Sequence, residues 1–91
     1  MSEPQRRWTI ILDQQPKKMM RRLPRNLLQR IDRAILALAE DPYPPGCKKL
    51  KGYDNLYRIR VGGWRISYAV ESDRLIVLVI EVTPRGRAYR F

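Results

Sequence analysis

The sequence predicts a single α+β domain over residues 1–91, in which an N-terminal strand and two helices pack on a mainly antiparallel, twisted sheet of about four strands. Apolar residues between 27 and 38 repeat every three or four positions, as on the buried face of a helix. After Gly52 the apolar repeat changes to every second position, which is typical of strands. Hydrophobic residues make up 44% of the chain, which is enough to form one modest core.

The N-terminal half is expected to form one strand and two helices. Residues 8–12 are aromatic, β-branched or aliphatic and end at the polar Asp13, so a buried strand is expected there. A short helix over 16–23 follows, and then a longer helix that ends before Pro42, because the residue before a proline avoids helical backbone. The apolar face of the longer helix consists of Leu27, Leu28, Ile31, Ala34, Ile35 and Leu38.

The C-terminal half is expected to form three strands, over residues 56–61, 64–70 and 75–82. Gly62-Gly63 and residues 71–74 separate them, and both segments have the composition of hairpin turns. The third strand is apolar on both faces, which predicts a central strand that is covered on both sides.

The chain is strongly basic, with 19 Lys and Arg against 9 Asp and Glu and a formal net charge of +10. This charge favours a polyanionic partner, which means RNA, DNA or an acidic protein. The single Cys47 has no partner for a disulfide and no His beside it, so it is expected to be structurally incidental. No signal peptide is recognisable and the longest apolar run, 75–80, is too short to cross a bilayer, so a cytoplasmic protein with no membrane partner is expected.

A two-residue turn at Gly62-Gly63 sets the register of the first hairpin. Arg60 then faces Arg65, and Arg58 shares their side of the sheet. Like charges opposite each other destabilise a sheet, and these strands carry no carboxylate, so the cluster indicates an anionic ligand. A solvated sheet face remains the alternative interpretation. The opposite face should pack on the helices with Tyr57, Ile59, Val61, Trp64, Ile66 and Tyr68.

The chain resembles the RelE/ParE superfamily of toxins of type II toxin–antitoxin systems, and its RelE-like branch in particular. The resemblance rests on the Leu-Lys-Gly connection at 50–52, on the Y-R-I-R-V-G-x-x-R-x-x-Y pattern at 57–68, and on the R-x-x-x-Y pattern from Arg85 to Tyr89. It covers nearly the whole chain and implies the fold of the RelE-like microbial ribonucleases.

The resemblance also implies an activity, since RelE-type members cleave messenger RNA in the ribosomal A site. ParE-type members share the fold, inhibit DNA gyrase and usually lack the basic catalytic set. Retention of that set favours a metal-independent, ribosome-dependent endoribonuclease without a cofactor. A gyrase inhibitor that acts by binding alone is the alternative, and a simple RNA- or DNA-binding domain is a third possibility.

The resemblance assigns the candidate catalytic residues. Arg58 and Arg60 occupy positions where the best-known RelE enzymes have lysines. Because arginine keeps its proton, neither residue can act as a base. We expect both to orient the RNA backbone. Arg65 would contact phosphate, and Arg85 would stabilise charge or protonate the leaving oxygen. Tyr89 is the preferred base in this His-free chain, and Glu81 is the alternative base or a counter-charge.

The remaining expectations concern partners. Ribosomal RNA is expected to contact Lys17, Lys18, Arg21, Arg22, Arg25, Lys48, Lys49, Lys51 and Arg87. The resemblance implies two direct partners, a ribosome carrying mRNA and a cognate acidic antitoxin. The antitoxin is expected to cover Arg58, Arg65 and Arg85 or to displace the C-terminal tail. Operator DNA is expected to be contacted only through the antitoxin complex. Codon preference, oligomeric state and the effect of Arg in place of Lys at 58 and 60 are left open.

Overall fold

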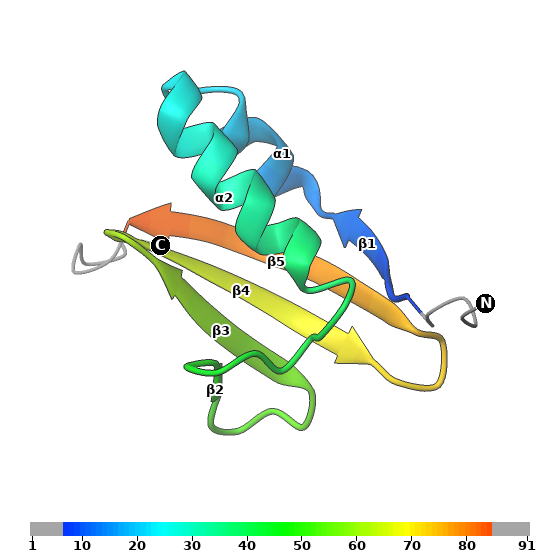
Figure 1. The fold of residues 1–91 in the computed structure, drawn as a ribbon. Coiled ribbons are helices and arrows are strands. Elements are labelled where there is room, and N and C mark those ends of the chain that lie inside the picture. Colours follow the sequence, from blue (N-terminus) through cyan, green and yellow to red (C-terminus); the bar gives the residue numbers. More distant parts are fainter. Residues whose placement is uncertain (1–6, 85–91) are drawn as a thin grey trace.

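The computed structural model describes residues 7–84, which form two helices and one five-stranded sheet (Figure 1). The helices are α1 (Gln14–Met20) and α2 (Arg25–Ala37). The strands are β1 (Thr9–Leu12), β2 (Lys48–Lys49), β3 (Leu56–Val61), β4 (Trp64–Glu71) and β5 (Ile76–Pro84). The order across the sheet is β1-β5-β4-β3-β2, and only β1 and β5 pair in parallel. The predicted α+β class is therefore confirmed.

Both predicted helices are present, although their ends differ from the expectation. The first begins earlier, at Gln14, because the Asp13 side chain accepts a hydrogen bond from the Gln14 N–H (2.8 Å) and caps the helix. It ends at Met20 rather than at residue 23. The second helix begins directly after Pro24, whose extended backbone (φ −60°, ψ 153°) separates the two helices.

The three C-terminal strands and the hairpin register are confirmed, whereas the expectation of a buried first strand is wrong. The predicted buried first strand is half-exposed, with Ile11 42% exposed, because β1 lies at the edge of the sheet and pairs only with β5. The fifth strand, Lys48–Lys49, pairs with β3 and was not predicted. Two lysines carry no apolar alternation, so only their pairing defines them as a strand.

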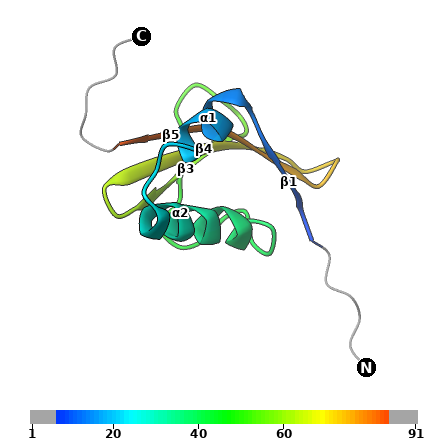
Figure 2. The same cartoon turned by 90° about the horizontal axis from the view of Figure 1, so that it is seen from above.

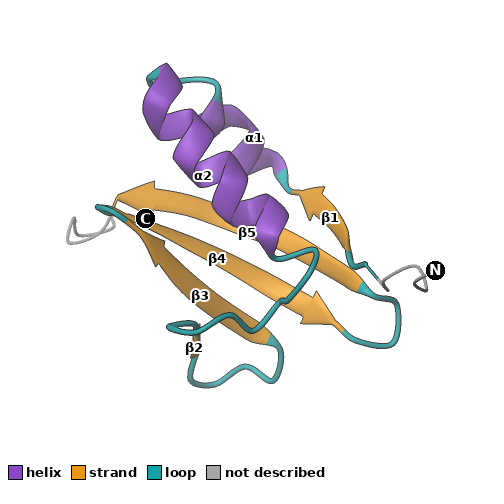
Figure 3. Cartoon of the chain, viewed as in Figure 1, coloured by secondary structure: helices purple, strands orange, loops and turns teal. Residues whose placement is uncertain are grey.

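The two helices occupy different positions relative to the sheet. Seen from above, α2 covers one face of the sheet, and α1 runs beside β5 (Figure 2). Figure 3 shows the view of Figure 1 with the helices and the strands in separate colours. Neither helix in the described part of the chain is long and apolar enough to cross a membrane.

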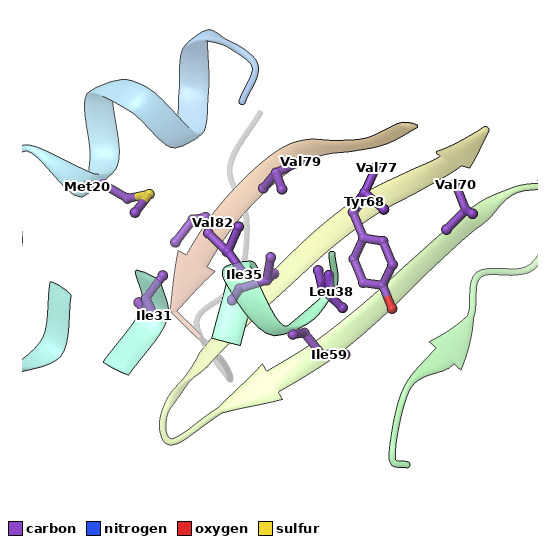
Figure 4. Close-up of a cluster of buried hydrophobic side chains, with 11 residues drawn as sticks. Met20, Ile31, Ile35, Leu38, Ile59, Tyr68, Val70, Val77, Val79 and Val82 are labelled. Carbon is purple, nitrogen blue, oxygen red and sulfur yellow. The ribbon is translucent and has the colours of Figure 1, made fainter. Parts of the chain in front are cut away.

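The core fills the space between α2 and the sheet (Figure 4). Its side chains come from both helices and from alternate positions of the three long strands: Met20, Ile31, Ile35, Leu38, Ile59, Ile66, Tyr68, Val70, Val77, Val79 and Val82. Tyr68 is fully buried, and its hydroxyl donates a hydrogen bond to the Pro42 carbonyl (2.8 Å). This bond ties the loop after α2 to the centre of the sheet.

One expectation about β5 is only half right. The strand is internal to the sheet, with β1 on one side and β4 on the other. However, Ile76, Leu78 and Ile80 are only half-buried, whereas Val77 and Val79 are fully buried. The face of β5 that carries Ile76 and Leu78 is not covered by either described helix, because α2 packs on the other face and α1 beside the strand.

Candidate functional site

The hairpin of β3 and β4 places three arginines on the face that α2 leaves uncovered. Arg60 pairs directly with Arg65, and Arg58 pairs with Ser67, as the two-residue turn predicted. Directly opposed side chains have Cβ atoms about 4.5–5.5 Å apart. Arg60 is exposed and the other two are half-exposed, so the group is open to a ligand.

A β-bulge in β5 determines which of its side chains join these arginines. Ser67 pairs with Glu81 but the next residue, Tyr68, pairs with Val79, so Ile80 is the extra residue. After the bulge, Glu81 and Thr83 lie on the arginine side, because their β4 partners Ser67 and Arg65 lie there. The bulge had no signal in the sequence.

The short strand β2 adds a lysine to the same side. Lys48 pairs with Arg58 and shares its face of the sheet. Lys49 pairs with Tyr57 and therefore lies on the opposite face. One row across the sheet thus contains Lys48, Arg58, Ser67 and Glu81, and a second contains Arg60, Arg65 and Thr83. We refer to these seven residues as the arginine face.

Glu81 is the one carboxylate on the arginine face. It lies two strands from Arg58 in the same row, and neighbouring strands are about 4.8 Å apart, so roughly 10 Å separates their backbones. Between residues 7 and 84 the ion pairs are Arg7–Glu40 and Arg74–Glu71, and neither involves Glu81. The expected role of Glu81 as a counter-charge therefore has no ion pair to support it, and the face has a net positive charge.

The other predicted ribosome contacts that the structure describes lie elsewhere. Lys17 and Lys18 are on α1, Arg21 and Arg22 follow it, and Arg25 begins α2; all five are exposed. Lys18 and Arg22, with Gln15 and Met19, line an open hollow of about 190 Å³. Lys51 is exposed in the loop after β2.

The remaining predicted site residues are Arg85, Arg87 and Tyr89, and they lie outside the described residues 7–84.

Two features near the site were not predicted: a pair of hydrogen bonds from Gln15 and the closeness of the Arg30 guanidinium to the hairpin turn. The Gln15 side chain forms hydrogen bonds to both backbone groups of Val82. Its Nε2 donates to the Val82 carbonyl (3.0 Å), and its Oε1 accepts from the Val82 N–H (2.8 Å).

A second feature lies at the hairpin turn, where Gly62 has φ +58° and an added Cβ would lie 2.8 Å from Nη2 of Arg30. Arg30 therefore brings a further cation to the turn. A helical Gln or Arg carries no sequence signal for such a contact.

The final tyrosine of the hairpin motif belongs to the core. Burial, followed by the neighbouring Cys47, raises the pKa of the Tyr68 phenol above its usual value. A buried phenol that donates to a carbonyl and resists ionisation is unsuited to act as a base. Among residues 7–84, no three His, Cys, Asp or Glu side chains gather in a way that could hold a metal ion.

These features describe a small basic α+β domain with a cationic sheet face, and comparison with known proteins identifies its family. The family model described as the ParE toxin of the type II toxin–antitoxin system parDE matches residues 8–89. The chain therefore belongs to the RelE/ParE family of type II toxin–antitoxin toxins. The resemblance stated from the sequence is confirmed.

Several similar proteins and solved structures are named RelE. The chain is 33% identical over 76 residues to "Putative toxin RelE1" of Methanocaldococcus jannaschii, covering 80% of this chain and 84% of that protein. It superposes on the archaeal RelE of the RelE–RelB complex from Pyrococcus horikoshii with a TM-score of 0.79 and 28% identity, over 89% of this chain and 98% of that one. The isolated E. coli RelE toxin has the same fold, with a TM-score of 0.77, 24% identity, and 89% and 87% coverage.

Proposed function

We propose that this toxin is a metal-independent endoribonuclease that cuts mRNA in the A site of the ribosome and thereby inhibits translation. The observation that carries the proposal is the arginine face, where Arg58, Arg60 and Arg65 lie in register on a sheet surface that neither α1 nor α2 covers. A cationic surface of this kind suits the phosphodiester backbone of RNA.

The proposed reaction is attack by the 2′-hydroxyl of the RNA on the adjacent phosphorus, with departure of the 5′-oxygen. It needs a base for the hydroxyl proton, cations for the phosphorane and an acid for the leaving oxygen. Arg65 would contact the phosphate, while Arg58 and Arg60 would orient the RNA backbone. Arg85 would stabilise the developing charge or protonate the leaving oxygen.

Tyr89 is the proposed base. A free phenol with a pKa near 10 is only about one part in a thousand ionised at neutral pH. A guanidinium about 4 Å away, at an effective dielectric near 20, contributes roughly 4 kcal/mol to the phenolate before solvent screening. Such a cation would lower the pKa of the phenol, and the four arginines assigned to the site would provide it.

Glu81 is the competing candidate for the base, because it is a carboxylate on the arginine face. The variant Glu81→Gln keeps the size of the side chain and removes its basicity. We expect its cleavage rate to stay within about twofold of the wild type, a change of less than about 0.5 kcal/mol in barrier height. A loss of two orders of magnitude would transfer the base role from Tyr89 to Glu81.

The proposed partners are a ribosome carrying mRNA and a cognate acidic antitoxin. The support for an antitoxin is that solved relatives are RelE–RelB complexes, from Pyrococcus horikoshii and Methanococcus jannaschii among others. Operator DNA would be contacted only through the antitoxin complex, and the site of action would be the cytoplasm. Inhibition of gyrase is not favoured, because the similar curated proteins and structures are named RelE.

The test is cleavage of a defined mRNA programmed into 70S ribosomes, with free RNA as the control. The wild type, Arg85→Ala and Tyr89→Phe are compared. We expect cuts that need the ribosome and that are lost in both variants. Intact mRNA with the wild type, together with arrested DNA replication in expressing cells, would instead establish the gyrase-binding function.

A further inference from the structure

The edge of β5 that faces β1 is completed by a side chain rather than by a strand. The parallel pairing runs from Thr9 with Ile76 to Leu12 with Val79, and the last backbone bond is from the Asp13 N–H to the Val79 carbonyl (2.9 Å). Three residues further along β5, the carboxamide of Gln15 bonds to the N–H and the carbonyl of Val82. This pair of bonds reproduces the two contacts that a residue of a neighbouring strand would make.

This contact lies where β5 pairs with the part of β4 that carries Arg65. Val82 is fully buried and sits between Glu81 and Thr83, which both belong to the arginine face. Ile80, the extra residue of the bulge, lies two positions earlier, between the last β1 contact at Val79 and the Gln15 contact. Beyond the bulge β5 still pairs with β4, from Glu81 to Pro84, but its pairing with β1 has ended at Val79. Because a bulge disrupts pairing locally, the Gln15 contact on this second edge adds a constraint on the end of the strand.

We propose that Gln15 is a positioning residue: its carboxamide fixes the bulged end of β5 at Val82, and because Thr83 pairs with Arg65, this contact also fixes Arg65 on the arginine face. The inference rests on the proposed function for its catalytic consequence. Gln15 itself lies on α1 beside β5, and it acts through backbone atoms rather than by contact with RNA.

Three variants test the role. Gln15→Ala removes both hydrogen bonds, whereas Gln15→Glu keeps an oxygen for the Val82 N–H and loses the donor to the carbonyl. Gln14→Ala is the matched control, because Gln14 is the exposed neighbour in the same helical turn. Val70→Ala serves as a control for general destabilisation, since Val70 is buried near the opposite end of β4 and pairs with Val77.

The first measurement is ribosome-dependent cleavage by each full-length variant. We expect Gln15→Ala to lower kcat by about tenfold to a hundredfold while KM stays within about twofold, because a displacement near 1 Å in a reacting geometry has effects of that size. Gln15→Glu should lie between Gln15→Ala and the wild type, and Gln14→Ala should match the wild type. A kcat loss in Val70→Ala as large as that in Gln15→Ala would overturn the positioning role.

The second measurement requires no catalysis. Amide hydrogen exchange of Val82 should accelerate at least about tenfold in Gln15→Ala and not in Gln14→Ala, and the amide resonances of Glu81 and Thr83 should shift in Gln15→Ala only. If the wild type cleaves nothing, the proposed function fails by itself, and exchange then decides the inference. Unchanged exchange at Val82 in Gln15→Ala would overturn it.

Discussion

The two faces of the sheet are built from the same strands but have opposite properties. On the face under α2, Ile66, Tyr68 and Val82 are completely buried. Their immediate neighbours Arg65 and Thr83 point to the other face and help to form the arginine face. One face therefore supplies stability and the other supplies charge. We expect substitutions on the helix-covered face to lower the free energy of unfolding, and substitutions on the arginine face to lower activity.

The largest loss of stability is expected from Ile66→Ala on the helix-covered face. Ile66 has no exposed surface and lies in the core cluster between Ile59 and Val82, its partners on the adjacent strands. Truncation of a buried Ile to Ala costs about 2–5 kcal/mol. Denaturant unfolding measures the change. A loss below about 1 kcal/mol would contradict the division between the two faces.

A smaller loss of stability is expected at the turn that joins β3 and β4. Gly62→Ala adds a Cβ at φ +58°, within 2.8 Å of Arg30 Nη2. The left-handed backbone alone costs about 1–2 kcal/mol for a residue with a Cβ. Thermal unfolding of Gly62→Ala, Arg30→Ala and the double variant measures both parts. The double variant should recover only the steric part, and complete recovery would show that the backbone conformation is not strained.

The buried tyrosine predicts a pH dependence that belongs to the helix-covered face. Its pKa is raised in the folded protein from an ordinary value of 10.0 because of burial, so the protonated form is favoured by folding. The resulting stability is present below pH 10 and is lost as the pH rises from there toward the folded pKa, with a slope of at most about 1.4 kcal/mol per pH unit. The Tyr68→Phe variant should not show this part of the loss of stability above pH 10. Equal slopes for the wild type and Tyr68→Phe in unfolding experiments above pH 10 would contradict it.

The smallest change in stability is expected on the arginine face itself. Arg58→Ala should alter the free energy of unfolding by no more than about 0.5 kcal/mol. Its effect should appear in binding, because loss of one phosphate contact reduces the slope of log affinity against log salt by about one. Ribosome binding measured over a range of salt concentrations tests this. A stability loss comparable to that of Ile66→Ala would show that Arg58 belongs to the core.

Much of the fold and half of the site followed from local patterns. The two-residue turn and strand parity predicted Arg60 opposite Arg65, and the helical repeat predicted the buried face of α2. The bulge at Ile80 was not predictable, because Ile80 only continues the apolar run of residues 75–80 and the offset appears only when β4 and β5 pair. The contact between Gln15 and Val82 spans 67 positions and likewise depends on the tertiary structure.

The most direct test of the central claim compares two exposed or half-exposed arginines of the same chain. Arg65 lies on the arginine face, whereas Arg33 lies exposed on α2 beside Leu36. Ribosome-dependent mRNA cleavage is measured for Arg65→Ala and Arg33→Ala at equal fractions of folded protein. We expect a loss of at least about a hundredfold for Arg65→Ala, the usual effect of removing one group that stabilises transition-state charge, and none for Arg33→Ala. Equal cleavage by the two variants would contradict the assignment of the arginine face as the active surface.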